Sequence, residues 1–122
     1  MKDYKYLNVN PRQEAEPDCV CRAISLALQI PYSIVNRMLN ENGDIYTCDD
    51  LRVTCYSKLL QREFGLDSKD GRGRTAGYLA RLYKNNVLLL RLDGHLTCSI
   101  YGVVYDIWDC TDEVCDVYWI VE

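Results

Sequence analysis

The sequence predicts an α+β fold in which N-terminal helices pack on a C-terminal antiparallel sheet. Apolar residues recur at helical spacing through most of the chain, whereas short apolar runs of strand length fill its last part. Helices followed by antiparallel strands are typical of this class. The composition, with 48% hydrophobic and 26% charged residues among 122, fits one globular domain over residues 1–122.

The N-terminal part of the chain leads into the first helix. Residues 4–9 alternate loosely and predict a short edge strand or an extended arm. Residues 11–17 are polar and include two prolines, which is typical of a loop. Asp18 is a suitable N-cap, and the apolar spacing after it predicts a helix over residues 19–29 that Pro31 ends.

Three more helices are expected before the sheet. The apolar spacing predicts one over residues 33–43. Asp49 or Asp50 caps the next, which keeps a period of about 3.6 residues until Gly65 closes it. A short helix over residues 75–83 completes the helical part.

The pattern in the last part of the chain predicts four strands. The first is the apolar run over residues 87–92, and the last covers residues 117–121. Between them lie a strand that begins near His95 and one that begins near Val103, joined by a two-residue turn at residues 101–102. The sheet is therefore expected to be antiparallel.

The register of the central hairpin brings His95, the single histidine of the chain, close to a carboxylate. A two-residue turn puts Thr97 opposite Asp106 and His95 opposite Trp108, and all four side chains share one face. Asp106 is then the diagonal neighbour of His95 and can accept the imidazole N–H. A register slip of one residue would bring Asp109 there instead.

Cys19 is the predicted partner of this hairpin. It falls at the first helical position, where unpaired backbone N–H groups and the helix dipole lower the pKa of a thiol. We therefore interpret Cys19 as a nucleophile, His95 as its base and Asp106 as the residue that orients the base. The alternative is a buried cysteine at a helix start and a structural histidine.

The seven cysteines do not form a recognisable framework. Their number is odd and no secretory signal precedes them, so we expect reduced thiols, most of them small buried hydrophobic residues. No Cys-x-x-Cys pair is present, and neither a metal nor a cofactor is expected. A metal-stapled module built from His95, Cys98, Cys110 and Cys115 is the minor alternative.

Charge and hydropathy exclude two classes of partner. The net charge is −4 and the basic residues are scattered, which argues against direct nucleic-acid binding. No apolar run approaches the length that crosses a bilayer, so no membrane partner is expected. We expect a cytoplasmic protein.

Three motifs together resemble a group of small phage-encoded proteins that look like minimal papain-like cysteine peptidases. They are Tyr-Leu-Asn-Val-Asn-Pro over residues 6–11, Asp-Cys-Val-x-Arg-Ala-Ile over residues 18–24, and His-Leu-Thr-Cys-x-Ile-x-Gly-Val-x-Tyr-Asp-x-Trp-Asp-Cys over residues 95–110. The similarity runs over nearly the whole chain, although the middle helices agree only in pattern. Two departures are the carboxylate of Asp18 beside the thiol and the short chain.

The resemblance implies a papain-like fold with Cys19 as nucleophile, His95 as base and Asp106 as orienting residue. Gln13, six positions before the cysteine, takes the place of the glutamine that donates to the oxyanion in papain-like enzymes. The implied function is a cysteine-dependent acyl-transfer hydrolase, either a peptidase, an amidase or a deconjugating enzyme, acting on a protein or peptide in the host cytoplasm. The alternative is a catalytically silent phage accessory protein that binds and inhibits a host defence or regulatory protein.

Overall fold

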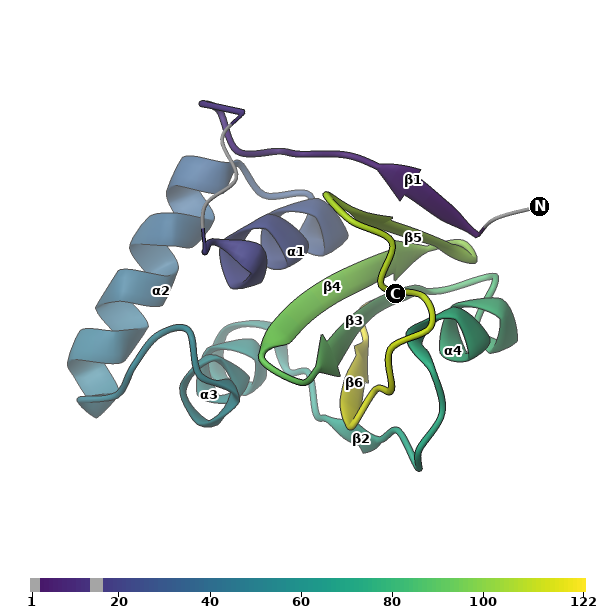
Figure 1. The fold of residues 1–122 in the computed structure, drawn as a ribbon. Coiled ribbons are helices and arrows are strands. Elements are labelled where there is room, and N and C mark those ends of the chain that lie inside the picture. Colours follow the sequence, from purple (N-terminus) through teal and green to yellow (C-terminus); the bar gives the residue numbers. More distant parts are fainter. Residues whose placement is uncertain (1–2, 14–16) are drawn as a thin grey trace.

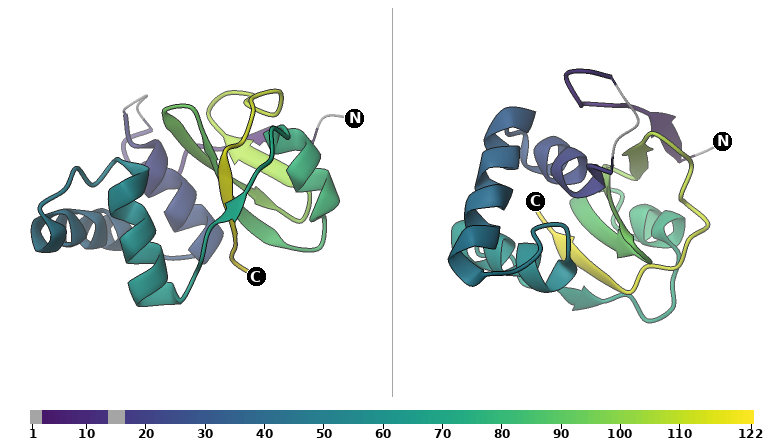
Figure 2. Two further views of the ribbon diagram at one scale, coloured as in Figure 1. Left: turned by 90° about the horizontal axis from the view of Figure 1, so that it is seen from below. Right: turned by 60° about the vertical axis from the view of Figure 1, so that its left-hand side comes forward.

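The computed structural model describes residues 3–13 and 17–122 and confirms the α+β class. In these residues four helices pack on a six-stranded sheet. Figure 2 shows the layers, with α1, α2 and α3 on one face of the sheet and α4 on the other. The helices are α1 (Cys19–Leu28), α2 (Tyr32–Tyr46), α3 (Val53–Phe64) and α4 (Ala76–Leu82).

The predicted helices are present with shifted ends. α2 does not end at Gly43 but continues to Tyr46. The glycine instead allows a close approach of the chain at Cys48, since a Cβ at Gly43 would lie only 3.0 Å from the Cys48 carbonyl oxygen. α3 begins only at Val53, because Asp49 accepts the Leu51 N–H at 3.0 Å in a preceding turn. The end of α3 at Gly65 is as predicted.

The sheet has the strand order β1-β5-β4-β3-β6-β2, in which β1 and β5 are parallel and all other pairs are antiparallel (Figure 1). Its outermost strand β1 confirms the predicted edge strand in shortened form, whereas the two-residue β2 was not predicted. The strands are β1 (Tyr4–Tyr6), β2 (Lys69–Asp70), β3 (Val87–Leu92), β4 (His95–Ile100), β5 (Val103–Asp106) and β6 (Val117–Ile120).

The central strand β3 is apolar along nearly its whole length because both faces of the sheet are covered. Leu89 packs into the core under α1, α2 and α3, whereas Leu88 and Leu90 pack under α4. In the described residues no single helix is long and apolar enough to cross a membrane; α1 and α2 together, with a bend of 120°, pass the same length and composition test.

The β4–β5 hairpin has the predicted register. Ile100 pairs with Val103 and Cys98 with Tyr105, and the turn residues 101–102 both have positive φ, as a type I′ turn requires. Asp106, the residue after Tyr105, ends β5, and His95 begins the neighbouring strand β4. The hairpin thus fixes the relation between the imidazole and the carboxylate.

Candidate active site

The imidazole and the carboxylate meet as the hairpin register predicts. His95 Nε2 lies 2.6 Å from Asp106 Oδ2, and Asp106 is only 3% exposed. The ring of Trp108 lies 5.2 Å from that of His95, between centroids, at an angle of 57°. Asp109 instead accepts hydrogen bonds from the backbone N–H and hydroxyl of Thr111, at 3.1 and 2.6 Å. The choice of Asp106 over Asp109 as the neighbour of His95 is confirmed.

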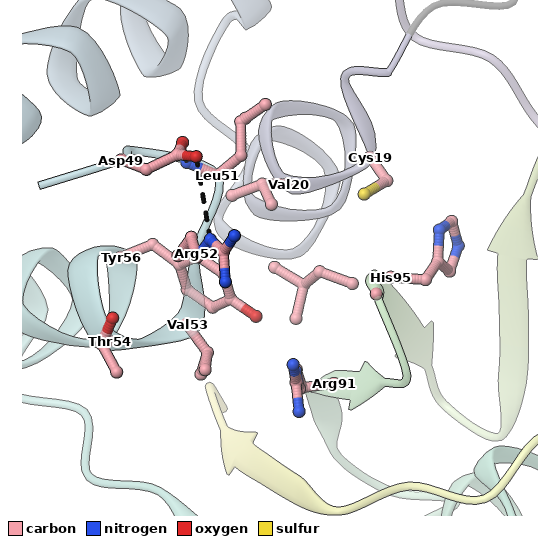
Figure 3. A pocket seen from close by; sticks show the side chains of 12 residues that line it. Cys19, Val20, Asp49, Leu51, Arg52, Val53, Thr54, Tyr56, Arg91 and His95 are labelled. Carbon is pink, nitrogen blue, oxygen red and sulfur yellow. Dashed lines mark hydrogen bonds and ion pairs between the residues drawn. The ribbon is translucent and has the colours of Figure 1, made fainter.

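Cys19 lies at the start of α1, beside the hairpin (Figure 3). Burial alone would raise the pKa of its thiol. Hydrogen bonds from His95 and from the Leu96 backbone N–H, together with the positive charges of His95 and Arg22, outweigh burial and lower this pKa below its ordinary value. Cys19 and His95 also line one pocket, so the structure brings the two predicted residues to the same place.

The electrostatics of the pair favour a thiolate and an imidazolium. Burial would lower the pKa of His95, but its hydrogen bonds to Asp106, Cys110 and Cys19 raise it well above its ordinary value. Burial would likewise raise the pKa of Asp106, but the bond from His95 holds it low. The carboxylate stays ionised and keeps the imidazole protonated.

Arg22 is a member of the site to which the sequence reasoning gave no role. Its Nη1 lies 3.0 Å from Asp106 Oδ1 and its Nε lies 2.6 Å from Asp18 Oδ1, with only 7% of its side chain exposed. Charges of opposite sign thus alternate from Asp18 through Arg22 and Asp106 to His95. The i, i+4 spacing of Asp18 and Arg22 on a helix was the available signal.

Asp18 occupies the predicted N-cap position but does not cap the helix with its side chain. Besides Arg22, its carboxylate accepts hydrogen bonds from the Tyr32 hydroxyl at 2.7 Å and from Asn10 Nδ2 at 2.9 Å. Within residues 3–13 and 17–122, no hydrogen bond joins the Cys19 backbone N–H to another residue. Such a donor lies at the positive end of the helix, where an oxyanion is favoured.

Gln13 does not join the site in the way the resemblance implies. It has a positive φ of 57°, and its Nε2 donates to the carbonyls of Asn8 and Asn10, both at 2.8 Å. The two amide hydrogens are thus used within the N-terminal loop. An oxyanion near Cys19 would have to be stabilised by other donors.

A second thiol lies against His95 and Asp106. Cys110 is fully buried, and its Sγ lies 3.7 Å from Asp106 Oδ2. The ligand atoms of His95, Asp106 and Cys110 lie within 4.8 Å of one another, a spacing that could hold a metal ion. The larger metal set considered from the sequence is not gathered among the described residues, because Cys98 and Cys115 turn to the carbonyls of Tyr105 and Val117.

The prediction that all cysteines are reduced is wrong in this structure. Cys48 and Cys55 form a disulfide that closes the loop between α2 and α3. All seven cysteines lie in the described ranges, and the remaining five are free. Four of them are buried, as expected of small apolar residues: Cys21, Cys98, Cys110 and Cys115.

A pocket of about 320 Å³ opens beside Cys19 and His95 (Figure 3). The start of α1 and the turn between β3 and β4 form one side, and the disulfide-closed loop with the start of α3 forms the other. Its remaining lining residues include Asp49, Arg52, Tyr56 and Arg91. The thiol therefore faces a space that a substrate can enter.

Comparison with known proteins adds no relative. No protein-family model, no curated protein and no solved structure matches this chain.

Proposed function

We propose that this protein is a papain-like cysteine hydrolase that cleaves an acyl bond of a protein or peptide substrate through Cys19. One observation carries the proposal: the imidazole of His95 contacts a buried carboxylate through Nε2 at 2.6 Å and lines the same pocket as Cys19, whose thiol pKa it lowers. With Nε2 facing Asp106, Nδ1 is the nitrogen left for the thiol. A thiol, an imidazole and a carboxylate in this order are the parts of a cysteine nucleophile with an oriented base.

The reaction begins with attack of the Cys19 thiolate on the substrate carbonyl carbon. The carbonyl π electrons move to the oxygen, which accepts the backbone N–H of Cys19 at the start of α1. The tetrahedral intermediate then collapses, and the bond to the leaving amine or alcohol breaks as the His95 imidazolium donates its proton to that group. An acyl thioester on Cys19 and a neutral imidazole result.

Hydrolysis of the thioester completes the cycle. Neutral His95 takes a proton from water, and the hydroxide attacks the acyl carbon. The second tetrahedral intermediate releases the carboxylic acid and the thiolate, so that the imidazolium–thiolate pair is restored. Asp106 keeps its charge throughout and holds the ring in place, while Arg22 holds Asp106.

The resemblance to small phage-encoded proteins supports the same chemistry, with a protein or peptide of the infected host as the substrate class. The alternative is a silent accessory protein that binds and inhibits a host protein, and no observation favours it. Four tyrosines are exposed by more than a third, and they lie on different elements: Tyr6, Tyr46, Tyr78 and Tyr101.

The proposal is tested by burst kinetics with p-nitrophenyl acetate, an activated acyl donor. We expect a burst of about one nitrophenolate per protein and an acetyl group on Cys19 in the mass spectrum of the acid-quenched protein. Cys19→Ser should abolish both, and Cys21→Ser, which changes a buried neighbouring thiol, should keep both. Absence of the burst, or acetylation spread equally over the free cysteines, would contradict the proposal.

A further inference from the structure

The pocket beside Cys19 has both polar and apolar lining residues, and its two fixed positive charges are arginines. Two arginines of different elements reach it, Arg52 just before α3 and Arg91 on β3 (Figure 3). Thr54 and Tyr56 are also among its lining residues. Burial raises the pKa of Tyr56 above its ordinary value, so this hydroxyl keeps its proton.

One carboxylate, that of Asp49, lines the same pocket beside Arg52. Asp49 accepts the Leu51 backbone N–H through Oδ1 at 3.0 Å, and its Oδ2 lies 3.9 Å from Arg52 Nε. The side chain of Arg52 is 77% exposed, so this ion pair is weak. The guanidinium of Arg52 is therefore available to a substrate.

Arg91 is held in position from outside the pocket. Its Nη1 pairs with Asp116, which does not line the pocket, and its charge faces the Tyr56 hydroxyl. A guanidinium offers five N–H donors, so the contact with Asp116 leaves others for a ligand. Arg91 thus gives the pocket a second, better fixed cation.

An acyl group bonded to Cys19 has this pocket within reach, because Cys19 is among the lining residues. Trp108 packs on His95 but does not line the pocket, and this residue is 43% exposed. The acyl part of the substrate remains bonded to Cys19 after attack and suits the more enclosed space. The leaving part, protonated by His95, can depart over the exposed Trp108 ring.

We propose that this pocket receives an acidic side chain, Asp or Glu, from the acyl part of a peptide substrate, bound by Arg52 and Arg91. The inference rests on the proposed function, since it names the substrate class of that site. A carboxylate has acceptors only, and it matches the two guanidinium groups of this pocket better than an amine does.

The test uses peptidyl chloromethyl ketones, which alkylate the thiol and need no known substrate. Matched pairs carry Glu or Gln at the first or second residue before the ketone, and the rate of Cys19 modification is followed by mass spectrometry. We expect Glu to react about five-fold faster than Gln in at least one pair, the effect of a partly exposed ion pair worth about 1 kcal/mol. Rates that agree within about two-fold in both pairs would overturn the inference.

Substitution of the exposed arginine identifies the cause of the preference. Arg52→Gln should reduce it, since Arg91 alone remains, and Arg52→Glu should reduce it further. Arg81→Gln is the matched control, because Arg81 is equally exposed but lies on α4, across the sheet. A preference for Glu that survives Arg52→Glu unchanged would refute the assignment.

A second reagent separates this inference from the proposed function. Iodoacetamide is small and neutral, so its reaction with Cys19 depends on the thiolate and not on the arginines. If Cys19 reacts with it no faster than the buried thiols do, the proposed function fails and this inference with it. If Cys19 reacts fast but Glu and Gln probes react alike, the inference alone fails.

Discussion

The carboxylate of Asp106 contributes both to the stability of the fold and to the proposed chemistry. It accepts hydrogen bonds from His95 Nε2 at 2.6 Å, from Arg22 Nη1 at 3.0 Å and from the Ile107 backbone N–H at 2.7 Å. Asp106→Asn keeps the size and shape of the side chain but removes its charge. Two buried cations then lose their shared partner.

The magnitude follows from the burial of this pair. Removing one partner of a buried ion pair costs about 3–5 kcal/mol. Because Arg22 keeps its second carboxylate, Asp18 at 2.6 Å, we expect a value at the lower end, a loss of about 3 kcal/mol in the free energy of unfolding. The pKa of His95 also falls toward its ordinary value, so less imidazolium faces the thiol at neutral pH.

Two assays follow these effects. Urea denaturation gives the free energy of unfolding, and iodoacetamide alkylation gives the reactivity of Cys19. We expect alkylation of Cys19 at pH 7 to slow about ten-fold, which corresponds to a rise of about one in the pKa of the thiol. The matched control is Asp109→Asn, an exposed carboxylate in a local turn, expected to change stability by less than about 0.5 kcal/mol. Equal stability of the two variants would refute the reasoning.

Three further predictions follow from the same contacts. The pKa of Asp106 is held at about 2, below its ordinary 3.8. Its contribution of about 2 kcal/mol to the free energy of unfolding is therefore present above pH 3.8 and lost as the pH falls toward 2. The Asp106→Asn variant should show a flatter acid denaturation curve. The raised pKa of His95 has the opposite effect on the pH dependence of stability: its stabilisation is full below pH 6.5 and is lost at alkaline pH. His95→Ala should therefore lose less stability than the wild type as the pH becomes alkaline. Replacing Cys48 and Cys55 together by alanine should lower the free energy of unfolding by about 2 kcal/mol, and dithiothreitol should lower that of the wild type but not that of the variant; an unchanged wild type would contradict the disulfide.

The local part of the candidate site could be predicted from the sequence. A two-residue turn with positive φ at both positions pins the hairpin register, and the register decides which carboxylate faces His95. The alternation of side chains along β4 and β5 then gives the contact with Asp106 and the packing of Trp108. Cys19 was predicted at the start of α1 because the apolar spacing after Asp18 is helical.

The long-range part could not be predicted in the same way. Arg22 reaches Asp106 across 84 residues of sequence, and no local pattern specifies that contact. Asp18 resembles a helix cap in sequence. Its carboxylate instead accepts hydrogen bonds from the side chains of an arginine, a tyrosine and an asparagine. Gln13 has the spacing of an oxyanion donor, but the positive φ of its loop turns the amide to neighbouring carbonyls. Such outcomes depend on tertiary packing.

The central claim is that His95 activates Cys19, and the rate of Cys19 alkylation as a function of pH tests it most directly. Iodoacetamide modification would be mapped by mass spectrometry on the wild type and on His95→Ala. We predict that Cys19 of the wild type reacts well below the ordinary pKa of a thiol and faster than the four buried cysteines, and that His95→Ala shifts its profile to higher pH. A Cys19 profile at the ordinary thiol pKa, unchanged by His95→Ala, would contradict the claim.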